Sequence, residues 1–150
     1  MVKLGKVISA DFDTKVWYSK VGNRFTVTKA LYTCHSDSEE MYQNEIKIQT
    51  LLAEKGLAPK ILEKDDRSTK NYVMWTSEDA GLPITENDVE AANSYLDTLY
   101  DMGVLLFSVG QYNFLKGWDG KIRATDFKVA ELLSQPITKD KREYIQWKTS

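Results

Sequence analysis

The chain has 150 residues, a formal net charge of −2 and a hydrophobic content of 42%. This composition excludes a disordered, collagen-like or low-complexity chain, and the length predicts one domain or two small lobes that share a core. The nearly balanced charge would not by itself recruit nucleic acid, and the longest purely apolar run, 104–107, is far too short to span a membrane.

The first third of the chain is predicted to contain strands and then a helix. Residues 7–10 and 12–18 have strand character, residues 20–23 favour a turn, and residues 24–33 alternate between two faces. The chain has a single cysteine, Cys34, and a single histidine, His35, which cannot form an intramolecular disulfide or a Cys/His zinc site. These two adjacent side chains are also poorly placed to act on each other as a catalytic pair.

A capping-box pattern at residues 36–39 predicts the start of a helix that continues to about Lys55 and ends at Gly56. Its apolar stripe contains Met41, Ile48 and Leu52, and Glu45 lies on the same stripe. A charged residue at such a position needs an explanation, because helix stripes of this kind normally face the core.

The remaining elements are predicted from the same patterns. Strands are expected at 60–63 and 71–76, a helix capped by Thr85 at 86–102, a hairpin formed by 111–115 and 121–125, and a short helix within 139–147. The stripe of the second helix is Val89, Ala92, Leu96 and Leu99. This order of elements, with strands, a helix, strands, a helix and a hairpin, is typical of an α+β fold.

Lys29 and Glu45 both occupy positions where apolar residues are expected. Lys29 interrupts the strand face that contains Phe25, Val27 and Leu31. Because a buried charge is costly unless it is paired, the pattern predicts that strand and helix pack together and that Lys29 contacts Glu45. The alternative is that Lys29 reaches solvent at a sheet edge while Glu45 lies at the rim of its stripe.

Several segments resemble protein-kinase motifs in the order in which that family has them. Residues 25–29 (F-T-V-T-K) resemble the strand whose lysine contacts ATP phosphates and pairs with a glutamate of the next helix. Residues 44–61 resemble that helix and its exit, and residues 71–75 the strand that leads to the hinge. Residues 103–115, with Asn113, are similar to the catalytic loop, and residues 120–128 to the strand that carries the metal-binding Asp-Phe-Gly at Asp126.

The resemblance covers about residues 8–132 and implies a minimal kinase-like fold over 1–150. An antiparallel sheet with one helix would form the small lobe at about 1–76, and a strongly truncated large lobe would occupy about 77–150. It also implies a nucleotide cleft in which Lys29 holds phosphates, Glu45 orients Lys29, and Asn113 and Asp126 hold Mg²⁺. ATP and magnesium are the implied cofactors only if that cleft binds nucleotide. Otherwise the four residues are relics of the family's site and have structural roles.

Departures from the family pattern argue against phosphate transfer, and no catalytic residue is assigned. The aspartate of the catalytic loop falls on Ser108, which has no carboxylate to accept a proton. The phosphate-covering loop falls on residues 9–16, which contain no glycine and two aspartates, Asp11 and Asp13. Lys128 replaces the glycine after Asp126-Phe127, and the segments that follow this motif in kinases are missing.

The leading hypothesis is therefore a catalytically inactive kinase-like protein that binds and modulates another protein. One alternative is nucleotidyl transfer from ATP in the same cleft, and another is a plain α+β binding domain with coincidental motifs. The compact chain resembles accessory proteins of phages and pathogens, which implies a host protein as partner. Cysteine usage and a start without a secretion signal predict the cytoplasm, which would be the host's if the protein is viral.

The apolar residues near the C-terminus require a partner surface. We expect them either to pack on the second helix or to form the seam of a homodimer, so that the chain is a monomer or a dimer. They are Leu132, Leu133, Ile137, Tyr144, Ile145 and Trp147.

Overall fold

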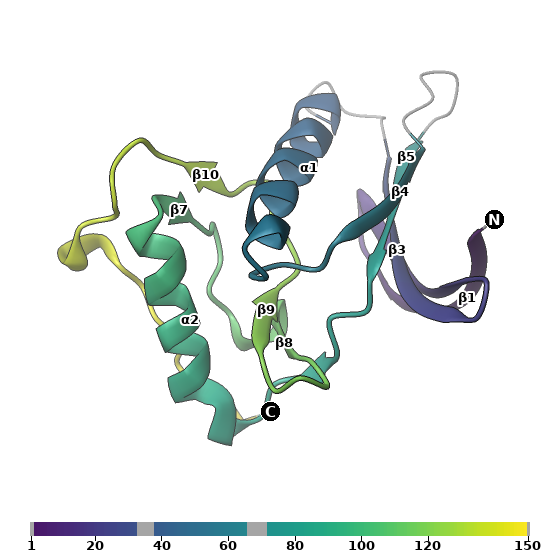
Figure 1. Ribbon diagram of the computed structural model, residues 1–150. Helices are drawn as coiled ribbons and strands as arrows, with labels where there is room; N and C mark the ends of the chain where they lie inside the picture. The colour runs from purple at the N-terminus through teal and green to yellow at the C-terminus, as the bar shows by residue number, and fades with distance from the viewer. Residues whose placement is uncertain (1, 33–37, 66–71, 150) are drawn as a thin grey trace.

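The computed structural model describes residues 2–32, 38–65 and 72–149, and its fold is α+β (Figure 1). A five-stranded antiparallel sheet lies at one end of the molecule, α2 (Val89–Asp101) lies at the other, and α1 (Ser38–Glu54) lies between them. Helix α1 is therefore placed to contribute to two cores. The sequence positions Cys34, His35, Ser36 and Asp37 lie outside the described residues.

The sheet has the strand order β1-β2-β3-β5-β4. Its strands are β1 (Val2–Ala10), β2 (Thr14–Val21), β3 (Arg24–Tyr32), β4 (Ile61–Asp65) and β5 (Tyr72–Glu78). The predicted turn between β2 and β3 is confirmed, with Gly22 at a φ of 62°. Strand β1 begins earlier than the pattern indicated and ends where the carboxylate of Asp11 accepts the backbone N–H groups of Asp13 and Thr14, which makes a local turn.

The two faces of β3 are buried by different means. On the face shared with Lys29, Leu31 packs with Tyr42, Ile46, Val73 and Trp75, which together form the sheet cluster. On the other face, Thr26 and Thr28 are 1% exposed, and hydroxyl–hydroxyl hydrogen bonds of 2.7–2.8 Å connect them to Ser19 and Thr76. These hydroxyls satisfy one another, so the polar face of the strand is buried without unpaired groups.

The larger core, here the main cluster, joins the C-terminal half of α1 to the second half of the chain. Its fully buried members include Ile48 and Leu52 of α1 and Ala92, Leu96 and Leu99 of α2. These are the apolar positions that the stripes of the two helices predicted. Gly56, with a φ of 73°, ends α1 as expected.

Short elements complete the second half. They are β6 (Leu82–Pro83), η1 (Glu86–Asp88), β7 (Val104–Leu105), η2 (Gln111–Asn113), β8 (Phe114–Lys116), β9 (Ile122–Ala124), β10 (Glu131–Leu132) and η3 (Lys139–Lys141). Strand β6 pairs with β8, β8 with β9, and β7 with β10, all antiparallel. The first turn of the predicted second helix is the 3₁₀ turn η1, and Thr85 and Asp88 form its capping box.

Two predicted elements of the second half are wrong in part. Residues 111–113 form a 3₁₀ turn rather than strand, so only β8 and β9 make the hairpin. Residues 139–147 do not form a helix beyond the single turn η3. The backbone after that turn bonds instead to side chains of α2, since Glu143 N–H donates to the Tyr100 hydroxyl and Ile145 N–H to Asn93.

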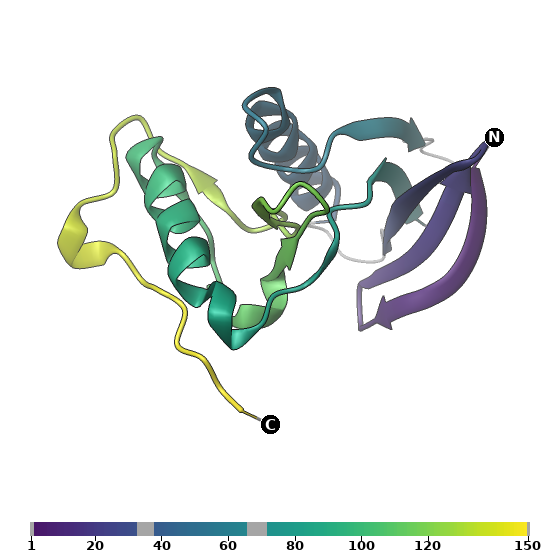
Figure 2. The ribbon, with the colours of Figure 1, turned by 60° about the horizontal axis from the view of Figure 1, so that its bottom comes forward.

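The C-terminal segment runs along α2, as the first of the two expectations for it predicted (Figure 2). Ile137 and Ile145 are buried in the main cluster, and Trp147 packs against it. Arg142 forms ion pairs with Asp97 and Asp101 of α2, with N–O distances of 3.0 and 2.7 Å. Among the described residues, no helix is long and apolar enough to cross a bilayer.

Candidate functional site

The structure brings Lys29 and Glu45 together. Lys29 Nζ lies 3.0 Å from Glu45 Oε1, and the two side chains are 16% and 2% exposed. The predicted ion pair is therefore confirmed, and the alternative in which both groups reach solvent is wrong. Lys29 is held by the register of β3 opposite Trp75 of β5, and Glu45 by the face of α1 that meets the sheet.

The same pair is bonded to the segment around Asp126. Lys29 Nζ also donates to the carbonyl oxygen of Thr125, and the backbone N–H of Phe127 donates to Glu45 Oε2. Asn44, the neighbour of Glu45, donates its side-chain amide to the carbonyls of Phe127, Lys128 and Ala130. Sheet, helix and the 125–130 segment therefore meet at one point, although they are far apart in sequence.

Burial raises the pKa of the Glu45 carboxyl above its usual value. The Lys29 ammonium acts in the opposite direction, and the nearby Asp126 carboxylate reinforces the effect of burial. The carboxylate is thus held in place by one cation and one backbone N–H rather than by water.

The other two predicted residues differ in their surroundings. Asp126 is exposed, and its carboxylate accepts the backbone N–H of Lys128 at 3.3 Å. Asn113, at the end of η2, donates its side-chain amide to the carbonyl of Ser108. Within the described part of the chain, Asn113 makes no hydrogen bond to Lys29, Glu45 or Asp126.

A further contact of the site involves Lys128, which sequence reasoning identified only as the replacement of a glycine. Lys128 Nζ lies 3.3 Å from Asp13 Oδ1 and 3.1 Å from Thr14 Oγ1, and the Lys128 and Asp13 side chains are 22% and 20% exposed. The turn between β1 and β2 is thereby tied to the segment that follows Asp126. No local pattern in the sequence indicates this contact, because its two residues are 115 positions apart.

The charges of this contact stabilise each other. Burial acts to lower the pKa of Lys128, but the carboxylates of Asp126 and Asp13 outweigh it and raise the pKa above its ordinary value. Burial acts to raise the pKa of Asp13, but hydrogen bonds from Thr14 and the Lys128 ammonium hold it below its ordinary value. Both groups are therefore charged at neutral pH.

The residues present do not fit a magnesium–nucleotide complex. The ammonium of Lys128 pairs with Asp13 and lies near the Asp126 carboxylate, and Asp11 and Asp13 place two negative charges in the turn that would have to accept phosphates. Ser108 is exposed and contributes a hydroxyl in place of a carboxylate. Among the described residues, no group of three or more His, Cys, Asp or Glu side chains is placed to hold a metal ion.

No protein-family model matches the sequence, and the search of curated proteins finds no significant match. The candidate site is therefore defined by its geometry alone. It consists of a buried Lys–Glu pair, a backbone segment bonded to that pair, and an ion pair that closes the β1–β2 turn onto this segment.

Proposed function

We propose that this chain is a catalytically inactive kinase-like protein that acts by binding another protein. The observation that carries the proposal is the contact of Lys128 with Asp13 and Thr14. In the register of the kinase resemblance, residues 9–16 correspond to the phosphate-covering loop and Asp126 to the metal-binding aspartate, so this contact would close that loop onto the segment that follows the metal position. A protein whose cleft is closed in this way would act through contacts of its surface with a partner and not through catalysis.

Two other features support the same conclusion. The Lys29–Glu45 pair is bonded internally to the 125–127 backbone, so it acts as a structural link between sheet, α1 and the second half. Ser108 cannot accept a proton from a substrate hydroxyl near neutral pH. The lobes of this kinase-like fold comprise about residues 1–76 and 77–150, and the Lys29–Glu45 pair lies where they meet.

The proposed setting is the cytoplasm, and for a phage or pathogen protein it is the cytoplasm of the host. Its partner is then a protein of the host. The chain binds this partner as a monomer or a homodimer: Ile137 and Ile145 are buried in the main cluster, whereas the apolar residues Leu132, Leu133 and Tyr144 are exposed.

The test is an assay of phosphate transfer from γ-labelled ATP, with Mg²⁺ or Mn²⁺, to the protein itself and to generic protein substrates. We expect no incorporation, and no change in melting temperature with millimolar Mg-ATP. Incorporation of γ-phosphate that Asp126→Ala abolishes would overturn the proposal. A parallel reaction with α-labelled ATP addresses nucleotidyl transfer, and label incorporated there would make that activity the function.

A further inference from the structure

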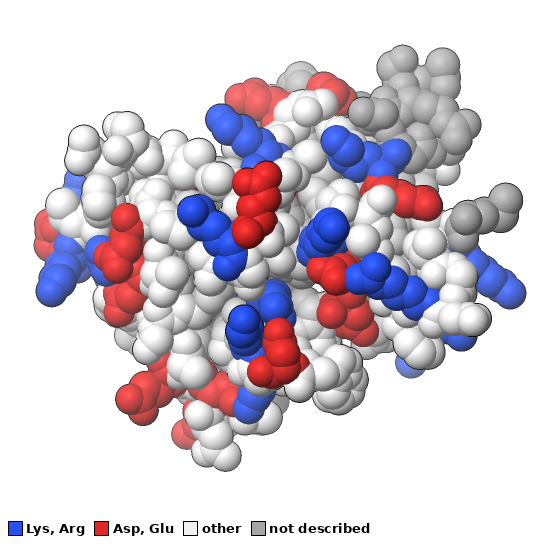
Figure 3. Space-filling view, viewed as in Figure 1, with Lys and Arg blue, Asp and Glu red and all other residues white. Residues whose placement is uncertain are grey.

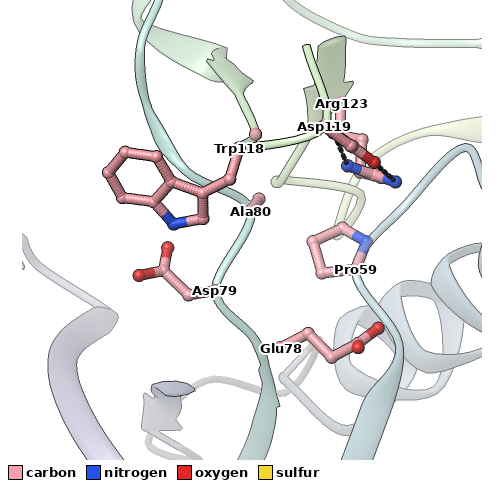
Figure 4. A pocket seen from close by; sticks show the side chains of 8 residues that line it. Pro59, Glu78, Asp79, Ala80, Trp118, Asp119 and Arg123 are labelled. Carbon is pink, nitrogen blue, oxygen red and sulfur yellow. Dashed lines mark hydrogen bonds and ion pairs between the residues drawn. The ribbon is translucent and has the colours of Figure 1, made fainter. Parts of the chain in front are cut away.

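A cleft of about 270 Å³ lies between three connections of the chain (Figure 4). The α1–β4 connection contributes Pro59, the end of β5 and the link to β6 contribute residues 78–80, and the β8–β9 turn contributes residues 117–119. None of these residues belongs to the Lys29–Glu45 site. The cleft is therefore a separate feature of the surface.

Trp118 forms one wall of this cleft and is 84% exposed. The turn that carries it is fixed, because β8 pairs with both β6 and β9 and because Gly81 and Gly117 allow very close backbone packing. A Cβ at Gly81 would lie 1.9 Å from the carbonyl oxygen of Lys116. An indole this exposed offers a large apolar face that a ligand can cover.

Most charged groups of the cleft already have partners. Asp119 accepts two hydrogen bonds from the guanidinium of Arg123, at 2.9 and 3.3 Å. Glu78 accepts the backbone N–H of Lys60 with one oxygen and pairs with Arg24 through the other. Arg123 is thus committed, which leaves no free cation among the described lining residues to hold an anion.

Asp79 differs from these groups. Its Oδ1 accepts the backbone N–H of Gly81 at 2.9 Å, and Oδ2 has no hydrogen-bond partner among the described residues. Figure 4 shows its carboxylate directed towards the indole of Trp118. With three carboxylates and one guanidinium, the lining residues carry a formal charge of −2.

We propose that this cleft binds an arginine side chain of the protein partner. A guanidinium can stack on the exposed face of Trp118 and donate to the free oxygen of Asp79, and Arg is the cation that combines both interactions best. Acidic and basic side chains are intermixed on the face of the molecule seen in Figure 3, so recognition is local to the cleft rather than due to a broad field. This inference rests on the proposed function in one respect, namely that the partner is a protein.

The first test is a titration with N-acetyl-arginine amide, followed by the indole N–H signal of Trp118 in ¹H–¹⁵N correlation spectra. The Trp118→Phe variant identifies that signal by its absence. We expect saturable shifts for the arginine probe and at least about tenfold weaker binding of N-acetyl-citrulline amide, which has the same length but no charge. Equal binding of the two probes, or no shift with arginine, would overturn the proposal.

Variants make the test specific to the two residues. Asp79→Asn keeps the acceptor for Gly81 and removes the charge, so it should weaken arginine binding about tenfold without unfolding the protein. Trp118→Ala should abolish arginine binding, which is then followed through the amide signal of Gly120. Glu63→Gln on β4 is the matched control, because it removes one carboxylate outside the cleft and should leave arginine binding unchanged. Undiminished binding by Asp79→Asn contradicts the proposal. If the arginine probe causes no shift and the ATP assays are negative, only the arginine site is overturned. If γ-phosphate is incorporated, the proposed function is overturned instead.

Discussion

Glu45 is the residue whose loss should cost most at the scale of single side chains. It is 2% exposed, and it holds Lys29 Nζ and the backbone N–H of Phe127 at the same time. Glu45→Ala leaves a buried ammonium and a buried N–H without their partner. We therefore expect the free energy of unfolding, measured by urea denaturation, to fall by ~3–5 kcal/mol. Glu40→Ala, an exposed position of the same helix, is the control and should change stability by under ~0.5 kcal/mol. A similar loss for both variants would show that the Lys29–Glu45 pair is not the cause of the effect of Glu45→Ala.

Lys128 acts as an internal cation for the carboxylates that surround it. If Lys128→Gln removes that charge, Asp13 and Asp126 repel each other and attract a divalent ion in its place. We expect millimolar MgCl₂ to raise the melting temperature of the variant but not that of the wild type. Lys121→Gln, an exposed change in the β8–β9 turn, is the control. An identical magnesium response of all three proteins would contradict this role of Lys128.

At the scale of elements, the C-terminal segment is held on α2 by groups that titrate. The Tyr144 hydroxyl and the Arg142 guanidinium both donate to Asp97 and hold the pKa of its carboxyl below the ordinary 3.8. A carboxyl with a lowered folded-state pKa stabilises the fold above its unfolded pKa, and this contribution is lost as the pH falls through the folded value. We therefore expect Asp97→Asn to be less stable than wild type at neutral pH, and this difference to vanish well below pH 3.8.

The measurement is urea denaturation of both proteins across this acid range. Glu90→Gln, at an exposed position of α2, should show no such pH-dependent difference. If the Asp97→Asn difference persists unchanged at low pH, the contact of Asp97 with the segment does not depend on its charge.

The same elements show what sequence patterns can predict. Helical stripes placed Ile48, Leu52, Leu96 and Leu99 in the core, and two charges on apolar faces were enough to predict the Lys29–Glu45 pair. The extended course of residues 142–147 was not predictable from local sequence, because it depends on Tyr100 and Asn93 of α2. The Lys128–Asp13 contact joins positions that are 115 residues apart, and no local periodicity reports such a pair.

At the scale of the whole molecule, α1 makes the two clusters one unit. Tyr42 and Ile46 lie in the sheet cluster and Ile48 and Leu52 in the main cluster, so neither cluster is complete without this helix. We expect a single cooperative unfolding transition, in which tryptophan fluorescence and far-ultraviolet circular dichroism give the same midpoint. Leu99→Ala, in the main cluster only, should lower both midpoints together and cost ~2–5 kcal/mol. Separate midpoints would show that the sheet unfolds independently of α2.

The hydrogen bond from Phe127 N–H to Glu45 spans 82 residues, and this separation has a consequence during synthesis. Lys29 is translated before Glu45, so their ion pair can form as soon as α1 leaves the ribosome. At ~5–20 residues per second, the backbone that completes the site follows roughly 4–16 s later. At the start of that interval the nascent chain has β1–β3 and α1 but not yet β4 and β5, and until Phe127 arrives the second oxygen of the Glu45 carboxylate has only water to bond. A chaperone that binds the growing chain would meet this incomplete surface before the 125–130 segment covers it.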